Sequence, residues 1–320
     1  MNKIKPKFLI AAPSYSENSG GGLVLHQLCD LLNDHTEAFI VPMPRGSIIN
    51  WLNLNSVERL IEEEKQQLVN FKTSPELNTP IYSGKVAQSD SVAVYPEVVF
   101  GNPFQFKNVA RWVLYDSGFH RGMSCTSKGE IEFKFEKHFV GASIDGFSTC
   151  SGLRLNILMP KTIDYNELKN NVRRSLEDMH SCRAGTAFCV RKGKQHPHRL
   201  IDQSSICIDG RGLNEIREIF KKVKYFVSFD DETYFSHLAS AYGCYSIISD
   251  SNFKKNSLTK VDQRMKKMPW VAYSEEQIKN SWENRVKLLE FFENRVAESK
   301  SSVLEFFDFW VKRLNSEFVR

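Results

Sequence analysis

The stretch FLIAAPSYSENSGGGLVLHQLCDLLNDHTEAFIVPMP, residues 8–44, holds the pattern that decides the fold class. Residues 8–12 form a short apolar run that stops at a proline, which is typical of a buried strand. A polar loop follows, and apolar residues then recur on one helical face through residues 23–32. Residues 37–44 resemble a second strand. Strand, glycine-rich loop, helix and strand make one βαβ unit, which predicts a parallel sheet with helices on its faces.

The same alternation continues along the chain. Further strands are predicted at SVAVYPEVV, NVARWVLYD and LRLNILM (residues 91–99, 108–116 and 153–159), and one helix is expected within residues 53–78. A strongly polar helical stretch at residues 164–180 then marks a change in character. After it the segments TAFCVRKG, SSICIDG, NEIREIFKKV and KYFVSF repeat the alternation of strands and helices. Two similar α/β domains fit this pattern better than one large sheet.

Composition limits the class of protein. The chain has 320 residues, of which 41% are hydrophobic and 25% charged, as in soluble globular proteins. A net charge of +5 is too weak to indicate nucleic acid binding, but it suits phosphate-bearing ligands or an anionic membrane surface. The seven cysteines include no CxxC pair, so neither a zinc site nor a disulfide framework is predicted. We expect reduced thiols in a cytoplasmic protein, and the five-residue run near the N-terminus is too short for a signal peptide.

The C-terminal region from Ser274 to the end is predicted to be helical, and it is unusually aromatic. The residues concerned are Phe291, Phe292, Phe306, Phe307, Phe309 and Trp310. The first interpretation is a pair of amphipathic helices that pack on the α/β body. The second is an aromatic and basic face that contacts a membrane surface peripherally.

The loop SYSENSGGG lies between the first strand and the first helix. Ligands of open parallel sheets bind beyond the carboxyl ends of strands, near helix N-termini. Gly20, Gly21 and Gly22 would let the backbone approach a substrate closely. The spacing is not GxGxxG, so a dinucleotide site is not predicted, and a flexible connection is the alternative interpretation.

Three side chains after predicted strands are candidate general bases. Glu97 follows a strand and a proline in VYPEVVFGNP, where its carboxylate would project from the sheet edge. Asp116 and His120, in LYDSGFH, are rivals for the same role. The alternative for each is an ordinary surface or capping residue.

A basic loop, RKGKQHPHR, follows the strand TAFC. Arg191, Lys192 and Lys194 would supply charge and donors for a diphosphate. His196 and His198 suggest a metal, but no third ligand stands at a suitable spacing, and no metal site is predicted. The alternative is a solvated basic loop.

The segment FDDETYFSHLASAYGCYSIISD, residues 229–250, places acid and threonine before a short helix. An N-cap would account for one or two of these residues. Asp231 and Glu232 could bind ribose or sugar hydroxyls, while Thr233 and nearby backbone N–H groups reach a phosphate. Gly243 is expected to end the helix.

Taken in order, these segments resemble the bacterial GT-B glycosyltransferases of lipopolysaccharide and capsule assembly. The segment FDDETYFSHLASAYGC is similar to their donor-site segment, and CVRKGK to the start of their second domain. APSYSENSGGGLVLHQL and VYPEVVFGNP are similar to segments of their acceptor-side domain. The resemblance covers most of residues 8–275.

The resemblance implies two Rossmann-like domains facing a cleft, with the acceptor on the first and the nucleotide sugar on the second. The corresponding boundaries are residues 1–165 for the acceptor-side domain, 183–275 for the donor domain and 276–320 for helices that pack back on the body. It also implies that no metal cofactor is required, because Arg191, Lys192, Lys194 and the helix beginning at Thr233 would stabilise the leaving diphosphate.

One position departs from the family pattern. Many retaining members carry two glutamates eight residues apart, and on that pattern Asp230 takes the first place and Leu238 the second. The second carboxylate is missing, so neither the donor geometry nor the stereochemistry is carried over.

The sequence therefore predicts a glycosyltransferase that moves a sugar from a nucleotide donor to a surface glycan, with Glu97 as the acceptor-side carboxylate. Peripheral contact with the inner membrane would suit a lipid-linked acceptor. Two alternatives stay open. One is a sugar-nucleotide epimerase or hydrolase, and the other is a non-catalytic protein of the same fold that binds glycans or partner proteins.

Overall fold

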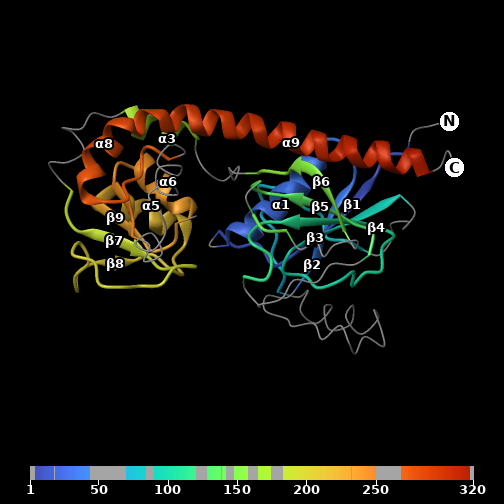
Figure 1. Ribbon diagram of the computed structural model, residues 1–320, viewed down its shortest axis with the longest axis horizontal. Helices are drawn as coiled ribbons and strands as arrows, with labels where there is room; N and C mark the ends of the chain where they lie inside the picture. The colour runs from blue at the N-terminus through green and yellow to red at the C-terminus, as the bar shows by residue number, and fades with distance from the viewer. Residues whose placement is uncertain are drawn as a thin grey trace. The chain divides into compact units, whose positions relative to one another are not determined.

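The computed structural model describes residues 4–17, 19–43, 70–83, 90–119, 128–137, 139–141, 148–157, 165–173, 183–231, 233–249 and 268–317. The chain divides into two compact units, each with its own parallel sheet (Figure 1). Unit 1 comprises Met1–Thr162 and Arg295–Arg320, and unit 2 comprises Ile163–Asn294. The chain is thus a mixed α/β protein with two sheets of Rossmann-like type, which confirms the predicted α/β fold class.

Unit 1 is built on a six-stranded sheet with the order β2-β1-β3-β4-β5-β6, and all its strand pairs are parallel. The strand order reverses between β1 and β3, which makes this position the switch point of the sheet. The strands are β1 (Lys7–Ala12), β2 (Ala38–Pro42), β3 (Ser91–Pro96), β4 (Asn108–Val113), β5 (Glu130–Lys134) and β6 (Ser148–Arg154).

Both faces of this sheet are covered, which explains why β1 reads as an unbroken apolar run. Phe8 belongs to a buried cluster with Leu28 of α1 (Gly20–Leu32) and Phe306 of α9 (Lys287–Glu317). Leu9 points to the opposite face, where the loop after β3 packs. The two helices therefore cover one face and loops cover the other.

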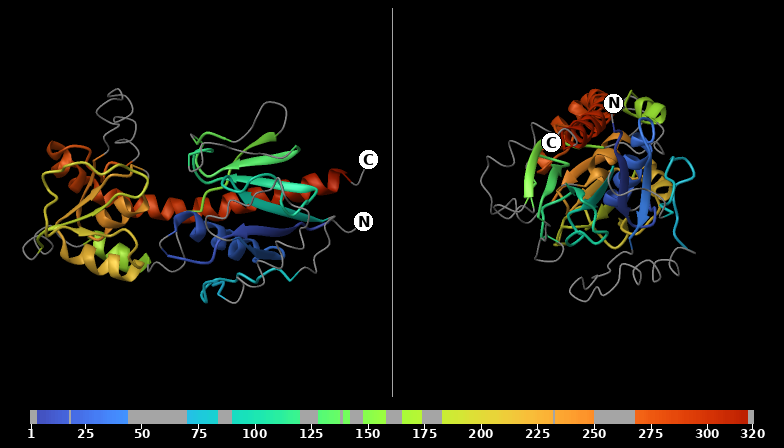
Figure 2. Two further views of the ribbon diagram at one scale, coloured as in Figure 1. Left: turned by 90° about the horizontal axis from the view of Figure 1, so that it is seen from below. Right: turned by 90° about the vertical axis from the view of Figure 1, so that its right-hand side faces the viewer.

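The aromatic residues of α9 pack inward within unit 1. Phe306 is 1% exposed, and its ring lies 5.2 Å from Phe8 and 4.7 Å from Phe133 between centroids. Near the end of α9, Asn315 exchanges two hydrogen bonds with the backbone of Ile4, so the start of the chain and the end of this helix lie side by side (Figures 1 and 2). Packing on the sheet accounts for these aromatic residues, and membrane contact stays a prediction.

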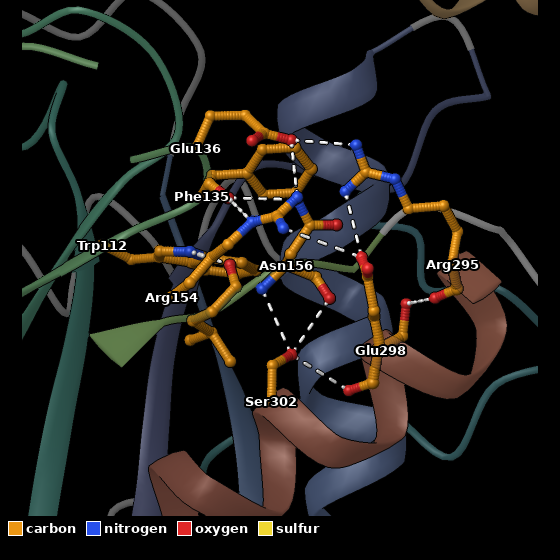
Figure 3. Close-up of polar contacts among 10 residues, drawn as sticks. Trp112, Phe135, Glu136, Arg154, Asn156, Arg295, Glu298 and Ser302 are labelled. Carbon is orange, nitrogen blue, oxygen red and sulfur yellow. Dashed lines mark hydrogen bonds and ion pairs between the residues drawn. The ribbon is translucent and has the colours of Figure 1, made fainter. Parts of the chain in front are cut away.

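Hydrogen bonds join α9, from Arg295 onward, to the ends of β5 and β6 and the residues just after them (Figure 3). The carboxylate of Glu136 accepts hydrogen bonds from Arg154 at 2.9 Å and from Arg295 at 3.2 Å. Two turns further along α9, the Ser302 hydroxyl accepts a hydrogen bond from Asn156 N and donates one to Asn156 O. These contacts fix the register of the helix along the sheet edge.

Unit 2 holds a four-stranded parallel sheet with the order β10-β9-β7-β8, and its switch point lies between β7 and β9. Its strands are β7 (Thr186–Cys189), β8 (Ile206–Cys207), β9 (Tyr225–Ser228) and β10 (Tyr245–Ile248). Its helical segments are α3 (Tyr165–Arg173), α5 (Leu213–Lys222), α6 (Tyr234–Ala241), η2 (Glu275–Gln277), α8 (Ile278–Glu283) and η3 (Asn284–Val286).

Several boundaries differ from the sequence prediction. Helix α1 begins at Gly20 rather than at Leu23, because Ser19 caps it by accepting a hydrogen bond from Gly22 N. The edge strand β6 ends at Arg154, so most of the apolar run expected at residues 153–159 follows the strand. The helix expected within residues 53–78 lies mostly outside the described residues. The division between the units falls inside α9 rather than before the C-terminal helices.

Across the described residues, no helix is both long and apolar enough to span a membrane.

Candidate functional site

The carboxyl end of the unit 2 sheet gathers most of the predicted donor-site residues. The loop after β7 carries Arg191, Lys192 and Lys194, and the segment after β9 carries Asp231 and Thr233. These two segments flank the switch point between β7 and β9. Ligands of open α/β sheets bind at such points, because the connections on either side diverge there.

Arg191 is held in a defined position at this edge. Its Nε lies 3.3 Å from Oδ1 of Asp209, and its guanidinium lies 4.5 Å above the Phe235 ring in the first turn of α6. Its φ is 48°, in the left-handed region that residues with a side chain adopt rarely. A left-handed arginine fixed beside a helix start is a local feature of the kind that clusters at functional sites.

Gly193 allows the basic loop to pack directly on the end of β9. A Cβ atom at this position would lie 1.8 Å from the carbonyl oxygen of Phe229. Any larger residue would therefore push the loop away from the switch point. Lys192 and Lys194, on either side of this glycine, are exposed.

Helix α6 starts at the same edge. Thr233 is its N-cap and accepts a hydrogen bond from Phe235 N at 3.4 Å, as the sequence predicts for a threonine in this place. Asp230 is buried, with its backbone bonded to the Ser228 hydroxyl, so it belongs to the interior. Asp231 is partly exposed, and Glu232 lies outside the described residues.

His196 joins the basic loop to the last strand of the unit 2 sheet. Its Nε2 lies 3.0 Å from the Ser249 hydroxyl, just after β10, and its ring meets that of Phe229 edge-on at 4.9 Å. Segments that follow all four strands of unit 2 therefore meet at the carboxyl end of its sheet, and Asp209 is the residue that follows β8 there.

The thiol next to this edge is not suited to nucleophilic chemistry. Cys189 ends β7 directly before the basic loop, and burial raises the pKa of its thiol to about 12. A thiol with so high a pKa stays protonated at neutral pH and is a poor nucleophile. In the part of the chain that the structure describes, no cluster of three or more histidine, cysteine or carboxylate side chains could hold a metal ion.

The predicted acceptor-side residues lie at the carboxyl end of the unit 1 sheet. Gly20, Gly21 and Gly22 form the first turn of α1, so the expected loop of glycines is instead a helix start. A Cβ on Gly21 would lie 3.7 Å from the side chain of Leu114, whereas a Cβ on Gly20 would meet no atom within 4 Å. Gly20 is therefore not required sterically.

The two described candidate bases each serve a backbone group. The Glu97 carboxylate accepts a hydrogen bond from Leu114 N at 2.9 Å, which links the ends of β3 and β4. Oδ1 of Asp116 accepts from Val140 N at 2.7 Å, which links the segments after β4 and β5. His120 lies outside the described residues. One oxygen of each carboxylate is thus occupied in holding loops together.

The sequence prediction missed the residues that place these loops. Arg111 of β4 makes a fully buried ion pair with Glu130 at 2.7 Å, and it also donates to backbone carbonyls of Pro96 and Gly101. It therefore anchors the loop that begins with Glu97. Its position inside a predicted strand gave no signal, because the contact depends on pairing β4 with β5.

His26 was also missed. It is buried in α1, its Nε2 donates to the carbonyl of Pro13 at 2.9 Å, and its ring stacks on Phe71. Burial lowers the pKa of this imidazole, so it stays neutral at physiological pH. It ties the loop after β1 to the helix that follows.

Comparisons with known proteins add no assignment: the chain matches no protein-family model, and neither a curated protein nor a solved structure shows significant similarity to it.

Proposed function

We propose that the chain is a glycosyltransferase that transfers a sugar from a nucleotide donor to a bacterial surface glycan of the lipopolysaccharide or capsule type. Unit 2 binds the nucleotide sugar, and unit 1 supplies the acceptor-side residues. A lipid-linked acceptor would bring the protein to the cytoplasmic face of the inner membrane as a peripheral protein.

The observation that carries the proposal is the arrangement at the unit 2 switch point. A guanidinium, Arg191, is held over the first turn of a helix whose N-cap is Thr233. Backbone N–H groups at a helix N-terminus and a fixed cation both favour a diphosphate. Lys192 and Lys194 are exposed on the same loop and add positive charge.

In the proposed reaction an acceptor hydroxyl attacks the anomeric carbon of the donor. A new glycosidic C–O bond forms while the bond from that carbon to the nucleoside diphosphate breaks. The hydroxyl proton passes to an acceptor-side carboxylate, for which Glu97 is the candidate. Arg191, Lys192 and the start of α6 neutralise the charge that develops on the leaving diphosphate, which is the largest electrostatic demand of the step.

One position defines how this chain would differ from the retaining members of that family. Leu238, at the place of their second glutamate, is fully buried in α6, so no side chain there reaches a ligand. The donor sugar must then be held by other groups, with Asp231 and Glu232 as the sequence candidates. We assign neither retention nor inversion.

A non-catalytic protein that binds glycans or partner proteins is the second candidate. It is favoured by one observation: the carboxylates of Glu97 and Asp116 each accept a backbone N–H and have a structural role that needs no chemistry. An epimerase or hydrolase of the same architecture is the third, and it requires donor turnover without an acceptor.

The test is release of nucleoside diphosphate from a panel of nucleotide sugars, with and without lipid-linked glycans extracted from bacterial membranes. A transferase releases nucleoside diphosphate from one donor at a rate that depends on the acceptor, and Lys192→Ala lowers this rate. Lys222→Ala, an exposed lysine of the same unit at the end of α5, is the matched control and leaves it unchanged. Release without acceptor indicates the hydrolase, and a changed donor sugar without release indicates the epimerase. No conversion of any donor contradicts all three enzymatic functions.

A further inference from the structure

Asp209 makes three contacts with Val190 and Arg191, where the chain leaves β7. It follows the short strand β8, and its Oδ2 accepts hydrogen bonds from Val190 N at 2.7 Å and from Arg191 N at 3.4 Å. Its Oδ1 lies 3.3 Å from Nε of Arg191. One carboxylate therefore binds both the backbone and the side chain of the arginine.

These contacts explain how an unfavourable backbone conformation is maintained. Arg191 has a φ of 48°, and within the described residues Gln105 is the one other non-glycine residue with a positive φ. Such a conformation persists where the surrounding contacts hold it, and two of the contacts of Asp209 are made to the backbone N–H groups of this turn. The side chain of Asp209 is 29% exposed and that of Arg191 24%, so the pair is only partly screened by water.

The result is a fixed direction for the guanidinium. It lies over the ring of Phe235, whose N–H is bonded to the N-cap Thr233. Asp209 thus holds the arginine, and the arginine itself lies against the first turn of α6. Planar guanidinium groups bind phosphate through paired hydrogen bonds, and such pairing depends on orientation.

We propose that Asp209 is a positioning residue for anion binding: it holds Arg191 beside the N-terminus of α6, in the orientation that binds a diphosphate. The inference rests on the proposed function, which supplies the diphosphate of the donor. It adds a residue for which neither the sequence pattern nor the resemblance gave a role.

Asp209 also carries a negative charge close to where the anion would bind, and this charge opposes binding. The charge of Asp209 and its positioning of Arg191 thus change anion binding in opposite directions. If Asp209 acts through its charge alone, its removal strengthens anion binding. If it positions Arg191, its removal weakens anion binding, because the arginine is no longer held in place. The direction of the change therefore decides between them.

The experiment measures the affinity of the full chain for inorganic pyrophosphate and for a panel of nucleoside diphosphates by titration calorimetry. Asp209→Ala is expected to weaken binding about tenfold or more, the usual effect of losing hydrogen bonds to a charged group. Asp209→Asn keeps one oxygen for the Val190 N–H, so it should preserve the loop conformation. It is expected to weaken binding less than Asp209→Ala does. Asp202→Ala removes an exposed carboxylate whose hydrogen bonds, among the described residues, go to Ser204 and Ser205, and it should leave the affinity unchanged.

A double-mutant cycle shows whether Asp209 acts through Arg191. Arg191→Gly suits the left-handed backbone and removes the guanidinium, so it should weaken binding without lowering the unfolding midpoint. Adding Asp209→Ala to Arg191→Gly is then expected to change the affinity less than about twofold, since the residue that Asp209 positions is gone. A purely structural role of Asp209 would instead weaken binding equally in both backgrounds.

Unchanged or tighter binding by Asp209→Ala and Asp209→Asn would overturn the inference and leave the donor site in place. If the unaltered protein bound neither pyrophosphate nor any nucleoside diphosphate, both the inference and the donor site would be wrong.

Discussion

Replacing Gly193 by alanine tests how closely the basic loop must pack on the end of β9. The added Cβ would lie 1.8 Å from the carbonyl oxygen of Phe229 and 3.0 Å from Asp230 N. A carbon and a carbonyl oxygen in contact stay about 3.3 Å apart, so the loop has to move by more than about 1 Å. Both atoms in the way belong to the backbone of the sheet edge, and no side-chain rotation relieves the clash.

Two consequences follow from this displacement. Overpacking of this kind costs about 1–3 kcal/mol of unfolding free energy. Because the loop carries Arg191 and Lys192, the proposed glycosyltransferase would also lose turnover of the nucleotide sugar by about a hundredfold with a shift of this size. The first effect is measured by urea unfolding and the second by release of nucleoside diphosphate, in the same preparations.

Gly212→Ala is the matched control in the same unit. Gly212 has a φ of −69°, and a Cβ there would meet no atom within 4 Å. Because Gly212 is the N-cap of α5, its replacement should lower the unfolding free energy by less than about 1 kcal/mol, and it should leave the turnover unchanged. Stability and turnover of Gly193→Ala equal to those of this control would refute the claim that the loop needs close contact with β9.

Three further predictions concern unit 1. Glu130→Gln should lower the unfolding free energy by about 3–5 kcal/mol, because it leaves the fully buried guanidinium of Arg111 without its counter-charge; a loss below about 1 kcal/mol in urea unfolding would contradict this. Phe306→Ala should cost about 3–5 kcal/mol in the same assay, whereas Leu304→Ala, 42% exposed on the same helix, should cost less than about 1 kcal/mol, and equal losses would mean that α9 does not pack as described. Burial lowers the pKa of His26, so the unfolded chain binds more protons than the folded one. The neutral imidazole therefore stabilises the fold above about pH 6.5, and this stabilisation is lost as the pH falls below that value. His26→Gln should make the urea midpoint depend less on pH between about pH 5 and 7.5.

The strands were the part of the fold that could be predicted best. Residues 8–12 and 92–95 are buried on both faces of the sheet, so their sequences are apolar without interruption. The edge strand β6 was misplaced because it is only partly covered: its residues are polar, and the apolar Leu155 and Ile157 enter the core after it ends. Apolar content follows burial rather than strand pairing, and at an edge the two separate.

The start of α1 was missed for a different reason. Three consecutive glycines indicate a loop, since glycine has a low intrinsic preference for helix. The N-cap hydrogen bond of Ser19 and the packing of the helix behind it outweigh that preference. Local propensity is a weak guide where tertiary packing decides.

The candidate site could be predicted in part. Basic and acidic residues directly after strands are visible in the sequence, and the parallel order of β7 and β9 places Arg191 and Thr233 at one switch point. Asp209 was not singled out, although it also follows a strand. Its role depends on β8 lying next to β7, which no periodicity in the sequence reveals.

The most direct test of the donor site is the thermal unfolding midpoint of the protein with UDP, GDP, CMP, dTDP and ADP at millimolar concentration. A ligand at a hundred times its dissociation constant adds about 2.7 kcal/mol to the unfolding free energy, enough to raise the midpoint by a few degrees. A donor site at the unit 2 switch point predicts a rise with one of these nucleotides that is lost in Lys192→Ala and retained in Lys222→Ala. No rise with any of them, or an equal rise in both variants, would contradict a donor site at the unit 2 switch point.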